Sequence, residues 1–178
     1  MRQKVVMSPT SSTASWMTRR RRTGLLIGLS FLCACSALTA VSAKTPGSTY
    51  CIGGICHRVM TIEEVEALVG SEEMVSASHY DDCRVDAGNP CSASSSGEEF
   101  RPDHADNAAS PVYPNGTMLL VTNPGTGLKT LVRINDSGPY HGVRELDVSR
   151  AAAERLGFAD AGIANLRIRI MSAPGQGH

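Results

Sequence analysis

The 178-residue sequence predicts a mostly β domain with one short helix near its end. The first observation is alternation, because apolar and polar residues take turns over residues 131–135 and again over 163–171. The second is turn chemistry, because residues 135–139 read Asn-Asp-Ser-Gly-Pro and end the earlier of these strands abruptly. The third is a helix signal, in which Ser149 is a good N-cap and Gly157 a good C-terminal stop.

The other strands of the domain follow in chain order. Residues 74–80 alternate and are predicted as its first strand. Residues 116–122 and 128–135 are predicted as a hairpin, and 144–148 as a short strand that leads into the helix. A polar loop over residues 81–109 is too long to be structureless without a reason, so either a function or a disulfide must explain it.

Residues 44–73 are predicted as a small N-terminal appendage packed on this domain. Residues 50–57 resemble a tight hairpin clipped by its own cysteines. Thr61 and Glu64 have the spacing of a capping box, which predicts the start of a helix that Gly70 ends. The residues expected to form the apolar face of this helix are Ile62, Val65, Leu68 and Val69.

Residues 1–43 have the composition of a secretory signal peptide. They contain no acidic residue, and six basic residues precede or flank the start of an apolar stretch that ends in Val-Ser-Ala at Ala43. We therefore expect export to the periplasm or cell envelope, with cleavage after Ala43. The alternative is lipidation at Cys35 as an outer-membrane anchor, because the preceding residues approximate a lipobox. An uncleaved membrane anchor fits less well, because Ser, Thr and Ala dilute the stretch after Leu32.

Removal of that leader makes the remaining chain acidic. It retains 11 Lys and Arg against 17 Asp and Glu, a net charge of about −6. This charge argues against nucleic acid and against anionic membranes as partners. We expect a monomer that needs no cofactor and no metal.

Four cysteines remain after the leader is removed, and an even number in a small exported domain indicates two disulfides. Three pairings are open, and we favour Cys51–Cys56 with Cys83–Cys91 because each closes a short loop. The alternative is a zinc site made by these cysteines and His57. It fits less well, because the spacings are not of the C-x-x-C type and the expected compartment is oxidising.

Three motifs occur in an order that is similar to that of one known family. They are Ser96-Gly97-Glu98-Glu99-Phe100, Pro114-Asn115-Gly116-Thr117, and the segment from Asn135-Asp136 through Arg144, Asp147 and Ser149 to Gly157. The sequence from about residue 75 to 170 thereby resembles the rare lipoprotein A family, the septal lytic transglycosylases of bacterial cell walls. The resemblance implies a six-stranded double-psi β-barrel over residues 74–171. The seven residues that remain after the last predicted strand, 172–178, are expected to form a disordered tail.

The resemblance also implies an activity and two active-site carboxylates, Glu98 and Asp136. The expected enzyme cleaves the β-1,4 bond between MurNAc and GlcNAc in peptidoglycan glycan strands and leaves 1,6-anhydromuramyl ends. Such a reaction needs an acid to protonate the leaving oxygen and an ionised carboxylate to stabilise the oxocarbenium centre. Glu98, near apolar Phe100, is the favoured acid and Asp136 the ionised partner, although these roles are exchangeable. We expect the two carboxyls to face one groove, about 5–9 Å apart.

Two positions depart from the family's pattern. Ser110 stands where the family has His, and Ser137 stands where it has Arg, so a hydrogen-bond partner and a positive charge are missing. We expect these two serines to bind substrate together with His141 and Arg144. Asp147 is interpreted as a structural residue that ties the start of the helix.

The alternative function is a non-catalytic cell-wall or glycan-binding module, as in expansin-like and barwin-like proteins. The same barrel serves both purposes, so the fold does not choose between them. The pair Glu98 and Asp136 favours the enzyme, whereas Ser110 and Ser137 favour the module.

Overall fold

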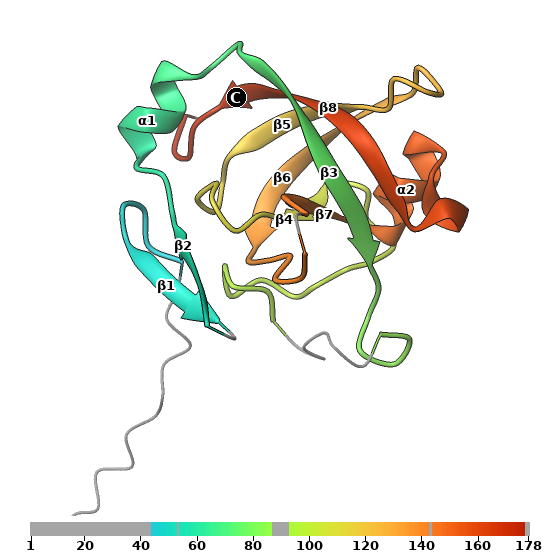
Figure 1. The fold of residues 1–178 in the computed structure, drawn as a ribbon, viewed down its shortest axis with the longest axis horizontal. Helices are drawn as coiled ribbons and strands as arrows, with labels where there is room; N and C mark the ends of the chain where they lie inside the picture. Colours follow the sequence, from blue (N-terminus) through green and yellow to red (C-terminus); the bar gives the residue numbers. More distant parts are fainter. Residues whose placement is uncertain (1–43, 53, 87–92, 143, 177–178) are drawn as a thin grey trace, which may run out of the picture. The chain divides into compact units, whose positions relative to one another are not determined.

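The computed structural model describes residues 44–52, 54–86, 93–142 and 144–176, and its centre is a closed barrel with the strand order β3–β7–β4–β6–β5–β8 (Figure 1). The β3–β7 and β4–β6 pairs are parallel, and the other pairs are antiparallel. The predicted six-stranded double-psi β-barrel is therefore confirmed. Its strands are β3 (Glu72–Tyr80), β4 (Asn107–Ala109), β5 (Met118–Thr122), β6 (Lys129–Asp136), β7 (Leu146–Ser149) and β8 (Ile163–Ser172).

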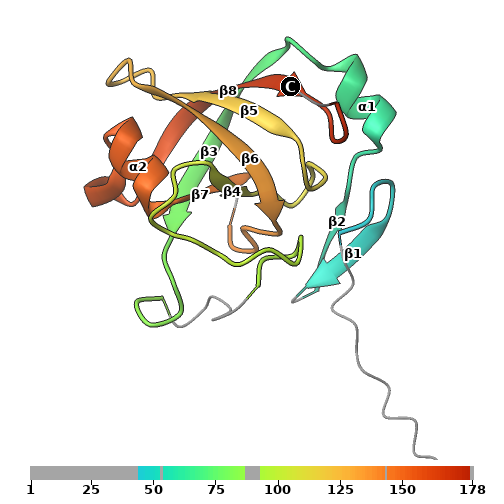
Figure 2. The ribbon, with the colours of Figure 1, turned by 180° about the vertical axis from the view of Figure 1, so that it is seen from behind.

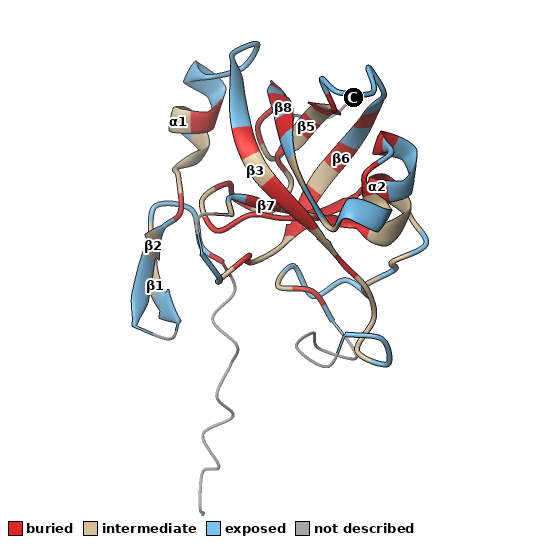
Figure 3. Cartoon of the chain, turned by 45° about the vertical axis from the view of Figure 1, so that its right-hand side comes forward, coloured by how far each residue is buried: buried red, intermediate tan, exposed pale blue. Residues whose placement is uncertain are grey.

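Buried and exposed residues alternate along the barrel strands (Figure 3), and most of the buried ones are apolar. In β8 the side chains of Leu166, Ile168 and Ile170 are buried, while Arg167 and Arg169 between them are exposed, as predicted. In β6 the side chains of Val132 and Ile134 are buried as expected, while Leu131 on the other face is 50% exposed. Burial of such side chains contributes roughly 1.5–3 kcal/mol each relative to exposure, so this strand pattern supplies most of the stability of the barrel.

Helix α2 (Arg150–Leu156) packs against the core with the caps that its sequence predicts. The Ser149 hydroxyl accepts a hydrogen bond from the Ala152 N–H. Gly157 ends the helix with a φ of 72°, a left-handed conformation that glycine adopts without steric cost. Leu156 is fully buried, so the helix is joined to the barrel by its apolar face. A short 3-10 helix, η1 (Ala159–Ala161), connects it to β8.

Strand β4 lies inside the long loop and was not predicted. Its sequence, Asn-Ala-Ala, lacks the β-branched and aromatic residues that usually mark a strand. Figure 2 shows it between β6 and β7, and its backbone pairs with both of them. The strand therefore exists because its neighbours supply hydrogen bonds, which local propensity does not reveal.

The N-terminal appendage contains the predicted hairpin and helix. Strands β1 (Thr49–Ile52) and β2 (Ile55–Arg58) are joined by the Cys51–Cys56 disulfide, which confirms this pairing. Thr61 and Glu64 form the predicted capping box at the start of α1 (Ile62–Ala67). The prediction for Leu68 and Val69 was wrong, because the helix ends before them and both side chains are exposed.

Hydrogen bonds join this appendage to the barrel domain. The Met60 N–H donates to the Val112 carbonyl at 2.8 Å, and the Tyr50 hydroxyl donates to the Pro111 carbonyl at 3.0 Å. The Gly70 N–H donates to the Ile170 carbonyl at 2.8 Å. The appendage is therefore a docked part of the domain, and its main docking segment follows β4.

Some predictions fall on residues outside the described ranges. The signal peptide, the lipidation site at Cys35 and the partner Cys91 of the second predicted disulfide all lie there. In the part of the chain that is described, no three or more His, Cys, Asp or Glu residues are grouped to hold a metal ion. The disulfide removes Cys51 and Cys56 from any zinc site. None of the described helices has the length and apolar character needed to cross a membrane.

The first residues of the segment predicted as a disordered tail, 172–178, are ordered and packed on the domain. Strand β8 runs to Ser172, and Ala173 is 1% exposed. The Gln176 side-chain amide donates a hydrogen bond to Glu66 at 3.0 Å. Packing and hydrogen bonding thus continue past the end of the last strand.

The Cys51–Cys56 disulfide gives a direct stability prediction. A double Cys51→Ser/Cys56→Ser variant should lose about 2 kcal/mol of unfolding free energy, because the crosslink closes a short loop in the unfolded chain. Urea unfolding followed by circular dichroism measures this loss, and a non-reduced peptide map of the wild type should show the crosslinked peptide. An unchanged urea midpoint, or free thiols at both positions, would contradict the prediction.

Candidate active site

Asp136 is the last residue of β6, and its carboxyl is fixed by the turn that follows. The backbone N–H groups of Ser95 and Ser137 both donate to Asp136 Oδ1 at 2.8 Å. Gly138 permits this turn because its φ of 106° belongs to a region that side chains avoid. The carboxyl is therefore held between the end of a strand and the loop that carries the first motif.

The environment of Asp136 favours its protonated form. Burial raises the pKa of this carboxyl above its ordinary value of 3.8. The two backbone hydrogen bonds and the positive charge of Lys44 oppose this effect and hold the pKa down in part. Asp136 consequently keeps its proton to a higher pH than an exposed aspartate does.

Glu98 is presented to the same strand end by a compact turn. The Ser94 N–H donates to the Glu98 carbonyl at 2.8 Å, and the Gly97 N–H donates to the Ser94 carbonyl at 2.9 Å. The Ser96 N–H then docks this turn on β6 by donating to the Asn135 carbonyl at 3.0 Å. A single turn therefore contacts Asn135 with its backbone and Asp136 through the amide of Ser95.

The Glu98 carboxylate is paired with Arg133 in a bidentate ion pair. Arg133 Nη1 and Nη2 donate to the two carboxylate oxygens at 2.8 and 2.7 Å, and Asn135 Nδ2 donates to Oε2 at 3.3 Å. The hydrogen bonds from Arg133 are the largest cause of a pKa below the ordinary value of 4.5, with slight burial opposing them. Of the two carboxyls Glu98 and Asp136, Glu98 is therefore the one whose environment favours the ionised form.

Asn135 connects this carboxylate to the barrel. Its side chain is fully buried, and Nδ2 also donates to Asn107 Oδ1 of β4 at 2.7 Å. Asn107 Nδ2 donates in turn to the carbonyls of Arg101 and His104. Asn135 Oδ1 is buried and has no hydrogen-bond partner among the described residues. The hydrogen bonds between Asn135, Asn107 and the backbone thus hold Asn135 Nδ2, which donates to Glu98, in place.

The other residues predicted to bind substrate lie in different settings. Ser110 is fully buried, and its hydroxyl accepts from the Val112 and Tyr113 N–H groups. Ser137 meets Asp136 through its backbone N–H, whereas His141 is exposed on the following loop. Ser110 follows β4, whereas Ser137, His141 and Arg144 lie in the segment between β6 and β7.

Asp147 accepts a hydrogen bond from the Ser78 hydroxyl of β3, which also accepts one from Arg144 Nη1 at 3.0 Å. Burial raises the pKa of Asp147, while Ser78 and the nearby charges of Arg144 and His79 oppose the rise. The side chain of Asp147 is thus hydrogen-bonded to β3. We expected Asp147 to tie the start of α2, which Ser149 caps. Backbone register places Asp147 beside Ala109 of β4, which in turn lies beside Asp136.

Tyr80 was missed by sequence reasoning, although it ends β3 close to these carboxyls. Its ring stacks on Phe100 with centroids 4.4 Å apart. Its hydroxyl is buried without a hydrogen-bond partner in the described part of the chain. Burial and the charges of Asp136 and Asp147 raise the pKa of the phenol, so it stays protonated. No sequence signal separated this tyrosine from an ordinary core residue.

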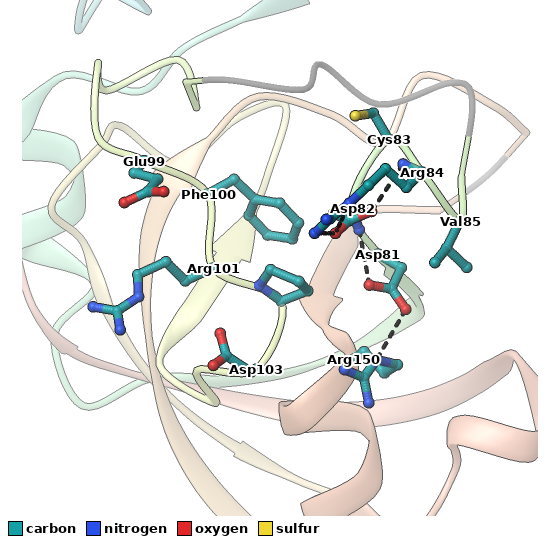
Figure 4. A pocket seen from close by; sticks show the side chains of 11 residues that line it. Asp81, Asp82, Cys83, Arg84, Val85, Glu99, Phe100, Arg101, Asp103 and Arg150 are labelled. Carbon is teal, nitrogen blue, oxygen red and sulfur yellow. Dashed lines mark hydrogen bonds and ion pairs between the residues drawn. The ribbon is translucent and has the colours of Figure 1, made fainter.

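A pocket of about 740 Å³, lined largely by charged residues, opens beside this region (Figure 4). Phe100 and Arg101 line one side, and Arg150, paired with Asp81 at 2.8 Å, lines the other. An aromatic ring among charged hydrogen-bonding groups suits a sugar, which presents both C–H faces and hydroxyls. The loop that holds Glu98 forms one wall, since Glu99 also lines the pocket.

Comparison with known proteins gives one family match. The family model described as lytic transglycolase matches residues 72–168. The endolytic peptidoglycan transglycosylase RlpA of Neisseria meningitidis serogroup A is 43% identical over 81 residues, which is 46% of this chain and 34% of the relative. RlpA of Vibrio cholerae is 43% identical over 65 residues, 36% of this chain and 25% of the relative. The chain thus spans about a third or less of the length of these relatives.

Two solved structures are also similar to the chain. The Streptomyces papain inhibitor has a TM-score of 0.44 and 19% identity, covering 57% of this chain and 96% of that one. An apo expansin of Clavibacter michiganensis has a TM-score of 0.42 and 24% identity, covering 58% and 52%.

Proposed function

Because this chain belongs to the lytic transglycolase family, we propose that it is an exported peptidoglycan lytic transglycosylase. It would cleave the β-1,4 bond between MurNAc and GlcNAc and leave 1,6-anhydromuramyl ends during cell-wall remodelling. One observation carries the proposal: the turn that presents Glu98, paired with Arg133, also holds the buried carboxyl of Asp136 through the Ser95 N–H. These two environments move the pKa values in opposite directions, down for Glu98 and up for Asp136. Acid-assisted glycoside cleavage needs one carboxyl with a raised pKa, which acts as the acid, and one with a lowered pKa, which stays ionised.

The surroundings of the two carboxyls favour Asp136 as the acid and Glu98 as the ionised partner, the reverse of the assignment that the sequence favoured. Asp136 is the acid that protonates the leaving glycosidic oxygen as the C1–O4 bond breaks. Ionised Glu98 stabilises the oxocarbenium centre that develops at C1. The Asp136 carboxylate then takes the proton of the muramyl C6 hydroxyl, and O6 bonds to C1 to close the anhydro ring. The sequence favoured Glu98 as the acid and left the two roles exchangeable; the bidentate pair of Glu98 with Arg133 supports the exchange, because it stabilises the ionised form of Glu98.

The surrounding groups would bind the strand. We place one sugar in the pocket walled by Phe100 and Arg101, and assign contacts with the cleaved unit to Ser137, His141 and Arg144. Ser110, which is fully buried, would act by shaping the loop behind Asp136. The protein would act as a monomer in the periplasm or envelope, either free or anchored through Cys35.

Incubation of the purified chain with peptide-free glycan strands tests this function. Mass spectrometry should detect anhydromuramyl ends that increase with time, and the boiled protein should produce none. Pelleting with purified sacculi is measured in parallel. Sedimentation with sacculi without any product would overturn the enzyme and establish the non-catalytic binding module.

The two pKa directions predict an acid-side pH optimum. Activity requires Glu98 ionised and Asp136 protonated, so the rate should fall as Glu98 gains its proton below pH 4.5. It should fall again as the pH rises through the raised pKa of Asp136, above 3.8. A pH series of initial rates measures both limbs. A rate that increases steadily from pH 4 to pH 9 would contradict this assignment.

A further inference from the structure

Lys44 is a buried lysine at the start of the described chain. It is 6% exposed, and its ammonium group donates hydrogen bonds to the carbonyl oxygens of Ser110 and, at 3.4 Å, of Asp136. Lysine is almost never buried unless its charge is paired or hydrogen-bonded, because desolvating an ammonium group is costly. These two hydrogen bonds hold the ammonium group between the segment after β4 and the end of β6.

The charge of Lys44 is coupled to the Asp136 carboxyl. Burial lowers the pKa of Lys44 to about 7, and the negative charge of Asp136 opposes that fall. In the other direction, the charge of Lys44 holds the pKa of Asp136 down against burial. Each group thus stabilises the charged form of the other.

Two phenols in the described part of the chain are also affected by the charge of this carboxyl. Tyr80 faces it from β3 and Tyr140 from the turn after β6, and Asp136 raises the pKa of both phenols. The negative charge of Asp147 of β7 also raises the pKa of Tyr80. In the described part of the chain, Lys44 is the one residue whose charge lowers the pKa of Asp136.

We propose that Lys44 is a positioning residue for the reaction, whose ammonium group stabilises the Asp136 carboxylate formed when the acid gives up its proton. The proposal rests on the proposed function for its role in catalysis. It also explains how the site works with serine at positions 110 and 137, because the cation comes from a segment outside the barrel. Ser110 supplies a carbonyl that accepts a hydrogen bond from this cation.

Carbon-13 NMR titration of the Asp136 carboxyl tests this coupling without any substrate. In Lys44→Met the pKa of Asp136 should rise by about 1 pH unit or more, because an opposite charge nearby lowers a carboxyl pKa by about 1–3. Lys44→Arg keeps the charge and should stay near the wild-type value. The control is Lys129→Met, which removes an exposed lysine of β6 and should change nothing. An unchanged Asp136 titration in Lys44→Met overturns the proposal.

A rescue separates the charge from a packing role. Adding Ser137→Arg to Lys44→Met places a guanidinium next to Asp136 and should return its pKa toward the wild-type value. A purely structural lysine would not be replaced in this way. If Lys44→Met does not fold, the reciprocal measurement decides: carbon-13 NMR of the Lys44 side chain in Asp136→Asn should show its pKa below the wild-type value of about 7, and an unchanged value overturns the coupling.

Product assays then connect the coupling to turnover. Lys44→Met should lower kcat more than it raises KM, and the basic limb of its pH profile should move to higher pH together with the Asp136 titration. If the wild type makes no anhydromuramyl product while the NMR titrations still shift, the proposed function fails and the Lys44–Asp136 coupling stands. If product forms normally and the titrations do not shift, the coupling fails and the function stands.

Discussion

Asp136→Asn should reduce the formation of anhydromuramyl ends by a factor of about 10²–10⁴, the range that a positioned general acid contributes. Asn has the shape of Asp and retains an oxygen that accepts from the Ser95 and Ser137 N–H groups. It has no transferable proton, so neither protonation of the leaving oxygen nor deprotonation of the C6 hydroxyl is assisted. Initial rates on peptide-free glycan strands measure the loss.

The melting temperature of Asp136→Asn should stay close to that of the wild type or rise slightly. Burial disfavours the charged form of Asp136, so removing the ionisable group does not remove stability at neutral pH. The matched control is Asp160→Asn, an exposed aspartate in η1. Asp136 and Asp147 both have a raised pKa, and the variant Asp147→Asn shows which of the two is the acid. Full activity in Asp136→Asn with loss of activity in Asp147→Asn would transfer the role of the acid to Asp147.

Glu98→Gln should lower kcat by about 10²-fold, an electrostatic effect comparable with that of one oxyanion-hole donor. With its oxygen at the position of Oε2, Gln still accepts from Arg133 Nη2 and Asn135 Nδ2, so the loop keeps its position, although the hydrogen bond from Arg133 Nη1 to Oε1 is lost. The negative charge is lost, however, and the positive charge of Arg133 is then left unneutralised beside a developing oxocarbenium centre. Steady-state kinetics should show the change in kcat with a smaller change in KM.

The stability of Glu98→Gln should change little. The side chains of Arg133 and Glu98 are 36% and 46% exposed, and ion pairs at this exposure contribute about 0–1 kcal/mol. Glu154→Gln is the matched control, because Glu154 is also exposed and pairs with an arginine, Arg150, at 2.8 Å. Wild-type turnover in Glu98→Gln would remove Glu98 from the mechanism.

Local patterns predicted most of the fold. Alternation identified β3, β6 and β8, and the Ser149 and Gly157 caps identified α2, because each signal lies within a few neighbouring residues. Strand β4 escaped prediction, because it is made by pairing with β6 and β7 and not by its own residues. Leu68 and Val69 were assigned to a helix face, because periodicity does not reveal where a short helix stops.

The candidate site was predictable only in part. The motif resemblance singled out Glu98 and Asp136, and alternation placed Arg133 on the same face of its strand as Asn135. The pairing of Glu98 with Arg133 joins residues 35 positions apart, and the contact of Lys44 with Asp136 spans 92 positions. Neither contact has a local signal. The assignment of acid and ionised partner depends on burial and on these distant partners, so the sequence left it open.

Digestion of peptide-free glycan strands in H₂¹⁸O, by the wild type and by Asp136→Asn in parallel, tests the roles of Asp136 as acid and then as base. The wild type should release strands whose new ends are 1,6-anhydromuramyl and carry no ¹⁸O, because the C6 hydroxyl and not water closes the ring. Asp136→Asn should release almost none. Reducing muramyl ends that carry ¹⁸O, or equal anhydromuramyl product from both proteins, would contradict this mechanism.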